Sequence, residues 1–525
     1  MASIITIARA GGLQHAEAQF QAGGFDARTN DPAALAVKGR LLKDRAVSLP
    51  PARRRPLFEQ AARYYAAADE LRPQPYTRIN TATLAMLSGD EDLGCTIARE
   101  LIDWMDRDTG IAETPYYLSA TRAEALILCD DVDGAKEAMR HALAHDPDGW
   151  DEHAVTIRQL SLVLSSKGKP ADWLDALRPP RSLHYAGHLG VAADSPDLEA
   201  RIDRFIDSER IGFGFGALAA GSDILVAERL LAAGAELHVV LPNRIEDFIN
   251  ASVAPYAQEW RNRFDSCLNA AASVRTMTRF SDGFQPLATR LASDTAKGSA
   301  LRHAARLESE AVQLVIVDEG PGEYGSGLET RRSGEIWRRT GARQHIMRWP
   351  RNASVPASGQ RQTPEGRADL RLTALLHIAF DGLEEVGDES FARAVDDVLT
   401  PLRRAIDGIA VQPDLVLPIG NARICAFAEP VAAWQHASDL MKLQNDAFPM
   451  RLTAHYGLAH WLDDPMALVG RTLTELVRIS EGAIPGVLTT SETFADALQL
   501  MPGTPPQVEP VGEVSGSSIF AAHLR

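Results

Sequence analysis

The stretch IGFGFGALAAGSDILVAERLLAAGAELHVVLP, residues 211–242, decides the fold of the middle of this chain. It contains a glycine-rich run, a segment whose apolar residues recur at helical spacing, and the short apolar run AELHVVLP. A short apolar run bounded by turn residues indicates a buried strand, and strands that alternate with helices favour a parallel sheet. The same alternation extends from about residue 181 to 350 and includes VQLVIVD at 312–318. We therefore predict an α/β domain over 181–350, with helices on both faces of a parallel sheet.

Residues from about 30 to 168 are rich in alanine, and their apolar positions recur at helical spacing. A predicted helix lies in LFEQAARYYAAADELRP, and a predicted helix pair lies in SATRAEALILCDDVDGAKEAMRHALAHDPDGW. Both end just before a proline, Pro73 and Pro147, which prevents a helix from continuing. The 74 residues between these prolines approach two units of a helix-turn-helix repeat of about 34 residues.

This all-α region, residues 1–170, resembles a degenerate form of tetratricopeptide repeats. It is similar to the tetratricopeptide-sensor region attached to bacterial conflict and signalling proteins. The usual Trp and Gly-Tyr positions of the repeat are poorly kept. The resemblance implies helices that hold a protein partner, and the alternative is a plain helical bundle.

Residues 351–370 are rich in Ser, Pro, Gly and Arg and have no periodicity, so we interpret them as a linker. Residues 371–525 begin with the strand-like run TALLHIAF and then alternate between helical patterns, a hairpin and further strands. This order predicts an α+β domain whose sheet is mostly antiparallel, with helices on one face. The chain is thus expected to be multidomain.

The charge balance argues against a protein that binds nucleic acid. Lys and Arg number 54 and Asp and Glu 70, which gives a net charge of −16, and such a surface repels a phosphate backbone. The run Arg53-Arg54-Arg55 is flanked by prolines and is expected to be a solvated loop. Hydrophobic residues make up 45% of the chain and charged residues 24%, which is ordinary for a globular protein.

The cysteines and the apolar runs suggest a location for the protein. Cys95, Cys129, Cys267 and Cys425 lie far apart without metal-like spacing, so we expect no disulfide framework and a reducing compartment. No apolar run has the length of a secretory core or of a membrane span. We therefore expect a soluble cytoplasmic protein with no membrane partner. His436, His455 and His460 are scattered over a predicted helix and strand, so structural roles are expected for them and no metal site is predicted.

Two glycine-rich loops in the middle domain have the chemistry to hold an anion. The first follows a predicted strand and opens a helix, and its candidate ligand-binding residues are Gly214, Gly216, Gly221 and Ser222. The second, residues 320–329, follows VQLVIVD. Ligands of doubly wound sheets bind beyond the carboxyl ends of the strands, where glycines permit close approach and amides at a helix start favour negative charge. The two loops predict a cradle for a negatively charged ligand.

The second loop resembles the motif PGGxGTxxE of the SLOG superfamily, Rossmann-like nucleotide-ligand domains related to the Lonely-guy phosphoribohydrolases. The residues that match in register are Pro321, Gly322, Gly325 and Glu329, while Ser326 stands in for Thr and Glu323 replaces a Gly. The resemblance implies a nucleotide-derived or ADP-ribose-like ligand. Arg306, fifteen residues before the proline, corresponds to an essential Arg of the hydrolases, so a hydrolase would use Arg306 and Glu329 for catalysis. Besides hydrolysis, the domain could sense its ligand without turnover or serve a purely structural role.

The C-terminal region resembles the class III nucleotidyl cyclase homology domain over nearly all of residues 371–525. That family uses two aspartates to hold two metal ions, and Ala379 and Asn421 stand at these positions. Asp381, two residues further along the strand, is a candidate for a displaced ligand. Of the transition-state pair, Thr474 replaces the Asn, and Arg478 is kept and could still bind a nucleotide. The resemblance implies a catalytically silent relative that forms homodimers.

These expectations combine into a regulatory receptor of bacterial nucleotide-dependent immunity or stress signalling. In it the middle domain binds a nucleotide-derived signal, the helical repeats bind a protein, and the C-terminal domain dimerises without turnover. An enzyme is the first alternative, either an N-glycosidic nucleotide hydrolase or a weakly active cyclase. A repeat scaffold with vestigial nucleotide folds is the second. No sequence motif identifies a cofactor beyond the expected nucleotide-derived ligand.

Overall fold

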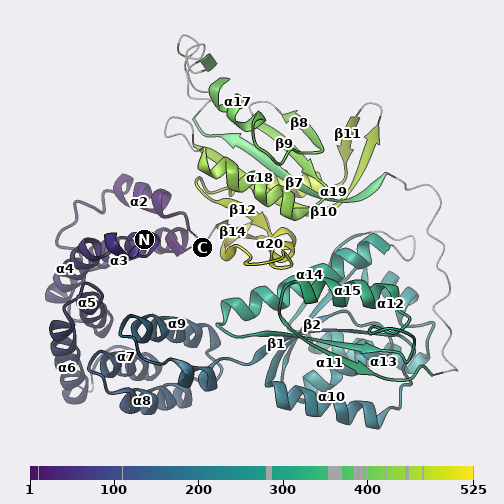
Figure 1. Cartoon of the computed structure of the whole chain (residues 1–525), viewed down its shortest axis with the longest axis horizontal. Helices are drawn as coiled ribbons and strands as arrows, with labels where there is room; N and C mark the ends of the chain where they lie inside the picture. The colour runs from purple at the N-terminus through teal and green to yellow at the C-terminus, as the bar shows by residue number, and fades with distance from the viewer. Residues whose placement is uncertain are drawn as a thin grey trace. The chain divides into compact units, whose positions relative to one another are not determined.

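A computed structural model describes most of the chain (Figure 1). The described residues are 1–9, 11–108, 110–279, 286–352, 369–382, 387, 390, 395–396, 400–419, 422–443, 449–463 and 466–523. They form two compact units. One comprises Met1–Pro179 with Arg306–Glu308, and the other comprises Pro180–Ala305 with Ser309–Arg525.

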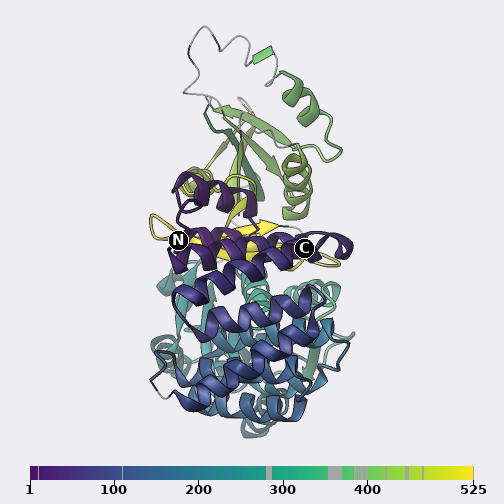
Figure 2. The same cartoon turned by 90° about the vertical axis from the view of Figure 1, so that its left-hand side faces the viewer.

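The first unit is built from helices that pack in consecutive pairs, as Figure 2 shows. In order they are α1 (Ala2–Arg9), α2 (Leu13–Ala22), α3 (Pro32–Ser48), η1 (Pro51–Arg53), α4 (Arg55–Leu71), α5 (Pro75–Leu87), α6 (Glu91–Arg107), α7 (Pro115–Leu128), α8 (Val132–His145), α9 (Trp150–Ser166) and η2 (Asp172–Leu177). Helix α3 packs on α4, α5 on α6, and α7 on α8. Pro73 and Pro147 follow α4 and α8 and are separated by two helix pairs, as predicted, so each pair takes about 37 residues instead of 34.

Small residues at the helix contacts explain why these pairs pack closely. Ala61 and Ala82 are fully buried between neighbouring helices. A Cβ atom on Gly94 of α6 would lie 2.9 Å from the carbonyl oxygen of Ala82 on α5. A Cβ on Gly39 of α3 would lie 2.8 Å from the ring of Tyr65 on α4. The helix backbones approach so closely that a side chain at either glycine would push them apart.

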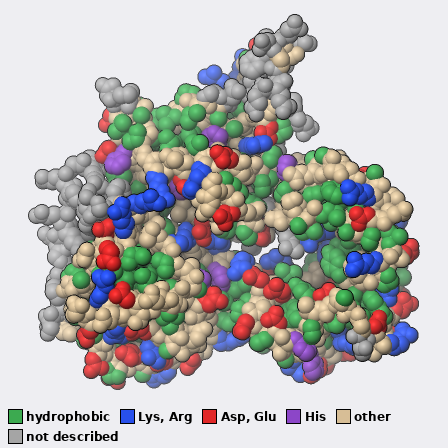
Figure 3. Space-filling model, turned by 180° about the vertical axis from the view of Figure 1, so that it is seen from behind, with side chains coloured by type: hydrophobic (Ala, Val, Ile, Leu, Met, Phe, Trp, Pro, Cys, Tyr) green, Lys and Arg blue, Asp and Glu red, His purple; other side chains and the backbone are tan. Residues whose placement is uncertain are grey.

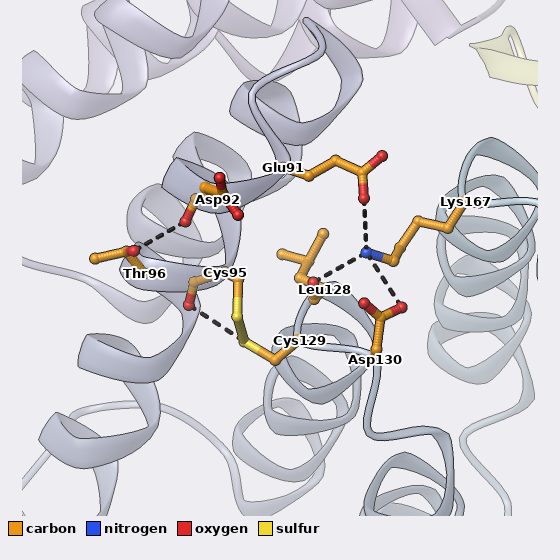
Figure 4. The surroundings of a disulfide bond; sticks show 8 residues. All are labelled: Glu91, Asp92, Cys95, Thr96, Leu128, Cys129, Asp130 and Lys167. Carbon is orange, nitrogen blue, oxygen red and sulfur yellow. Dashed lines mark hydrogen bonds and ion pairs between the residues drawn. A yellow bond between two sulfur atoms is a disulfide. The ribbon is translucent and has the colours of Figure 1, made fainter.

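One disulfide bond contradicts the expectation drawn from the cysteine spacing. Cys95 of α6 and Cys129 at the end of α7 are bonded, with their Cα atoms 4.8 Å apart (Figure 4). Beside the bond, the ammonium of Lys167 donates to the carbonyl oxygen of Leu128 at 3.2 Å. Cys267 and Cys425 are free and buried. Sequence spacing could not reveal the pair, because the packing of α6 against α7 brings the two cysteines together.

The middle of the chain forms the predicted parallel sheet, with strand order β4-β3-β2-β1-β5-β6. Its elements are β1 (Arg181–Gly187), α10 (Pro196–Glu209), β2 (Ile211–Gly216), α11 (Ser222–Ala232), β3 (Glu236–Leu241), α12 (Ile245–Ser252), α13 (Gln258–Ala270), β4 (Ser273–Thr276), α14 (Pro286–Arg306), β5 (Ala311–Val317), α15 (Leu328–Arg339) and β6 (Arg343–Arg348). Helices α10, α11 and α13 lie on one face of the sheet, and α14 and α15 lie on the other (Figure 1). The strand order reverses between β1 and β5, which is the switch point of a doubly wound sheet.

The C-terminal part forms a mixed sheet, with order β13-β14-β12-β10-β7-β9-β8 and β11 paired to β10. Its elements are β7 (Leu370–Phe380), α17 (Thr400–Asp407), β8 (Leu415–Ile419), β9 (Ala422–Phe427), α18 (Pro430–Lys442), β10 (Met450–Asp463), β11 (Met466–Val469), α19 (Arg471–Ser480), β12 (Leu488–Ser491), α20 (Glu492–Gln499), β13 (Gln507–Val514) and β14 (Ser517–His523). Among these strand pairs only β10 and β12 run parallel, so the prediction of a mostly antiparallel sheet is confirmed.

The prediction that the helices cover one face of this sheet is wrong. Ala374 and Leu376 of β7 pack with residues of α17, α18 and α20. Leu375, which lies between them and points to the opposite face, packs with Leu476 of α19. Consecutive side chains of a strand alternate between faces, so α17, α18 and α20 cover one face of the sheet and α19 packs on the other.

Helix α14 belongs to both sheets of the second unit. Ala292 and Ala296 pack on Val240 of β3, while Leu291 joins the core of the mixed sheet. Every residue from 294 to 300 is buried, so the helix is covered on all sides. A helix without an exposed stripe lies inside a structure, not on its surface. None of the helices in the described ranges is long and apolar enough to cross a membrane.

Candidate functional site

The carboxyl ends of β1, β2, β5 and β6 meet at one edge of the parallel sheet. The carbonyl oxygen of His188, just after β1, accepts a hydrogen bond from the hydroxyl of Ser222 at 2.9 Å. The amide of His188 donates to Ile316 of β5 at 3.2 Å, and Asn352 after β6 donates to Gly190 at 2.8 Å. Both predicted loops therefore border the end of β1, at the switch point.

The glycines of the first loop serve packing. Gly214 and Gly216 lie inside strand β2, where a Cβ on the first would collide with Leu230 of α11. A Cβ on the second would lie 2.6 Å from the ring of Tyr185 on β1. Gly221 has a positive φ of 86° immediately before α11 and lies against the backbone of residues 188–189. These glycines let helix and strand approach and turn the chain.

The donors around the first loop already have acceptors from the chain itself. The amides of Gly187 and Ala219 donate to the carboxylate of Asp223, at 3.2 and 3.4 Å. Ser222 is directed to the carbonyl oxygen of His188. Burial raises the pKa of Asp223 to about 7, although the two amide bonds oppose the shift. The amide donors around the first loop are thus occupied by the side chain of Asp223.

The second loop encloses a carboxylate, that of Asp318 at the end of β5. The amides of Gly320 and Ser326 donate to its Oδ1, at 3.1 and 2.7 Å. The hydroxyl of Ser326 donates to Oδ2, and Arg351 Nε donates to the same oxygen at 3.2 Å. Burial alone would raise the pKa of Asp318, but these bonds outweigh it and hold the pKa below its ordinary value. Ser326, which was predicted to bind a ligand, thus holds an internal anion in this structure together with Gly320 and Arg351.

The remaining residues of the second motif shape this loop. Gly322 and Gly325 have positive φ angles of 84° and 61°, and a Cβ on Gly325 would collide with the Asp318 carboxylate. Glu323 forms an ion pair with Arg338 of α15 at 2.6 Å, and its side chain is 55% exposed. Its charge is therefore neutralised by a neighbouring arginine, which reduces the like-charge repulsion that it would exert on a phosphate in this loop. Pro321 is exposed and lies between Gly320 and Gly322.

The structure does not bring Arg306 to Glu329. Glu329, in the first turn of α15, accepts hydrogen bonds from Arg290 at 3.2 and 3.3 Å. Arg290 is near the start of α14 and Arg306 is its last residue, so about 24 Å of helix separates them. Arg306 instead forms an ion pair with Asp151 of α9.

Sequence reasoning missed Asp318, Arg351 and Arg290. The position of Asp318 in VIVDEGPG, between a buried strand and a glycine loop, was a usable signal. No local pattern indicates Arg290, because only the docking of α14 on α15 places it beside Glu329.

In the C-terminal domain, an arginine lies opposite the first of the two positions that correspond to the metal-binding aspartates of the cyclase family. Ala379 of β7 lies directly opposite Arg451 of β10, so the two side chains share a face of the sheet. Arg451 forms an ion pair with the carboxylate of Asp381 at 2.5 Å. The displaced-ligand candidate is therefore held by a guanidinium. Asn421 lies outside the described residues.

Arg478 of α19 is bound within its own domain. It donates to the carbonyl oxygen of Ser515 at 3.1 Å and to the hydroxyl of Ser517 at 2.7 Å, and it also pairs with Glu475. Thr474 lies one turn earlier on the same helix. In this arrangement Arg478 connects α19 to the turn between β13 and β14.

The three histidines singled out in the sequence have separate partners. Nδ1 of His436 lies 2.7 Å from the carbonyl oxygen of Val411, that of His455 2.8 Å from the hydroxyl of Ser491, and that of His460 3.0 Å from the carboxylate of Asp369. Over the ranges that the structure describes, no three His, Cys, Asp or Glu side chains gather as a metal site.

Comparison with known proteins gives one family match and several structural likenesses. The family Tetratricopeptide Repeats-Sensor matches residues 3–85. The adenylyl cyclase CyaB from P. aeruginosa is 12% identical, with a TM-score of 0.25, over 30% of this chain and 95% of that chain. The guanylate cyclase domain of RhGC from Catenaria anguillulae, in complex with GTP, is 16% identical, with a TM-score of 0.25, over 30% and 97%. No curated protein matches the sequence.

Proposed function

We propose that this protein is a receptor for a nucleotide-derived signal, and that the parallel-sheet domain binds the ligand beyond the ends of β1, β5 and β6. The observation that carries the proposal is the convergence of anion donors there. The amides of Gly320 and Ser326, the Ser326 hydroxyl and the Arg351 guanidinium all direct hydrogen atoms to one point. Two amides, a hydroxyl and an arginine are a donor set suited to a phosphate.

A second arginine adds positive charge to this edge. Arg348, the last residue of β6, donates to the carbonyl oxygen of Gly322 at 2.7 Å. It thereby brings a second guanidinium to the loop that holds the donors. The protein as a whole carries a net charge of −16, and Figure 3 shows acidic and basic side chains interspersed over the face it displays. The charge at the site is local, which suits a small phosphate-bearing ligand better than a nucleic acid.

The match of residues 3–85 to a sensor family supports a role in signalling. In the proposed receptor the paired helices hold a protein partner. Ligand binding transmits a signal only if the ligand favours one arrangement of the protein over another, because equal affinity for both arrangements shifts nothing.

The C-terminal domain is proposed to dimerise without catalysis. Two features of the described residues support the absence of catalysis. Ala379 offers no carboxylate at a metal position, and the carboxylate of Asp381 is paired with Arg451. The proposal that it dimerises comes from the resemblance of residues 371–525 to the class III cyclase homology domain.

A ligand screen tests the receptor. Thermal unfolding of the full chain is measured with mono-, di- and cyclic nucleotides and with ADP-ribose derivatives. Binding to the folded state should raise stability by about 2.7 kcal/mol at a hundredfold excess over Kd. Ser326→Ala should abolish the shift because it removes a donor. The matched control is Ser266→Ala on α13, whose hydroxyl donates within its own helix. If no compound shifts the wild-type protein, the receptor is excluded.

One observation favours a second candidate, a hydrolase of nucleotide N-glycosidic bonds. Arg290 and Glu329 form the cation and carboxylate pair that such an enzyme needs, in place of the predicted Arg306. The protein is incubated with nucleoside monophosphates and NAD, and base release is followed by chromatography. Turnover that Glu329→Gln abolishes would establish the enzyme and replace the sensor.

A further inference from the structure

Asp318 is unusually well bound for a single loop carboxylate. Three hydrogen atoms from Gly320 and Ser326 and one from Arg351 reach its two oxygens, and its side chain is 7% exposed. The shape of the loop depends on this contact. Gly325 has a positive φ, and any side chain there would meet the carboxylate. The carboxylate therefore sits at the centre of the loop.

These donors are the group that the proposed function assigns to a phosphate. A carboxylate presents two oxygens with one negative charge in a plane, and a terminal phosphate presents three with nearly two charges. Both anions accept from backbone amides, a hydroxyl and a guanidinium. The two cannot occupy the same donors together, because their charges repel and each donor hydrogen serves one acceptor well.

We propose that Asp318 is an internal competitor of the ligand. In the unliganded protein its carboxylate occupies the anion site, and a phosphate-bearing ligand binds by displacing it. This inference rests on the proposed function and specifies how the site is regulated. The apparent affinity for a phosphate is its affinity for the open site multiplied by the fraction of molecules in which the site is open. Simple phosphate is thereby rejected, and only a ligand with further contacts opens the site.

The test uses Asp318→Asn in the full-length protein. The amide oxygen of asparagine still accepts from Gly320 and Ser326, so the loop keeps its shape while the competing charge is lost. Pyrophosphate and ADP are titrated by isothermal titration calorimetry at constant ionic strength. We expect the variant to bind at least one of them tenfold or more tightly than the wild type. Glu319→Gln is the matched control, since it removes one charge from an exposed neighbouring carboxylate, and it should change affinity less than twofold.

A second neutral variant, Asp318→Ser, provides the same test if Asp318→Asn does not fold. Thermal melts check that each variant is folded. If the folded neutral variants bind pyrophosphate and ADP no more tightly than the wild type, Asp318 only fastens the loop and the inference is wrong. In that case the receptor proposal can still hold. It holds if the wild type binds a nucleotide in the thermal screen. If neither the wild type nor any variant binds any of these anions, both proposals fail.

Discussion

At the residue scale, two buried aspartates behave in opposite ways because their partners differ. Asp223 has only two amide donors, and burial dominates, so its pKa rises to about 7. Asp318 has three donor bonds from its loop and a guanidinium, and these outweigh burial, so its pKa falls. Near neutral pH the carboxyl group at the first loop, Asp223, is therefore partly protonated. The one at the second loop, Asp318, is ionised.

Asp223 gives a prediction about pH. Its folded pKa lies above its unfolded value of 3.8, so between these values the folded state holds a proton that the unfolded state has lost. The contribution of this group to stability is therefore present below pH 3.8 and is lost as pH rises through about 7, by up to about 1.4 kcal/mol per pH unit. Urea unfolding gives the free energy of unfolding of the wild type and of Asp223→Asn at several pH values. The value for the wild type minus the value for the variant should fall as the pH rises towards about 7. Parallel curves for the two proteins would contradict it.

At the scale of the element, α14 meets α20 backbone to backbone. A Cβ atom on Gly298 would collide with the backbone of Asp496. Around this contact the buried carboxylate of Asp496 accepts from Ser299 and from Arg302 Nε, each at 2.8 Å. Arg302 also lies over the ring of Phe520, 4.4 Å from its centroid. A buried carboxylate with these partners holds the two helices in one register.

Gly298→Ala should therefore destabilise the protein. In a free helix the change would stabilise by about 1 kcal/mol, since alanine is the better helix former. Here the collision reverses the sign, and we expect a loss of roughly 1–3 kcal/mol. Gly408→Ala is the control, because the nearest atoms to its Cβ would be 3.4 Å away. Denaturant unfolding measures both, and equal effects of the two changes would contradict the close contact.

At the scale of the whole molecule, the mixed sheet depends on helix α14 for part of its core. Ala288 of this helix packs with Leu370 and Leu458 of the mixed sheet, and Leu291 joins the core on the same sheet. A fragment of the mixed sheet without α14 would expose these apolar surfaces to water.

We predict that residues 369–525 alone do not form a stable fold, whereas residues 180–525 do. Circular dichroism and thermal melts of the two fragments make the comparison. The shorter fragment should show no cooperative transition or a transition at markedly lower temperature. A cooperative melt of 369–525 at the temperature of the longer fragment would show that the mixed sheet does not need α14.

Local patterns were sufficient for the elements and for much of their order. The alternation in 211–242 predicted the parallel sheet, and the prolines after α4 and α8 marked the helix ends. The order of strands and helices after residue 371, with one predicted hairpin, indicated a mostly antiparallel sheet. These features depend on side-chain periodicity and turn residues, which act over a few positions. The predicted loops also reached one edge of the sheet, because strand order places them there.

Contacts between distant residues depended on packing that no local pattern encodes. The bond between Cys95 and Cys129, the pairing of Glu329 with Arg290 and the embedding of α14 between two sheets all follow from which surfaces meet. The filling of the predicted anion cradle by Asp318 is of the same kind. A residue's neighbours along the chain determine its conformation, but the free energy of burying its charge depends on the atoms that folding brings around it.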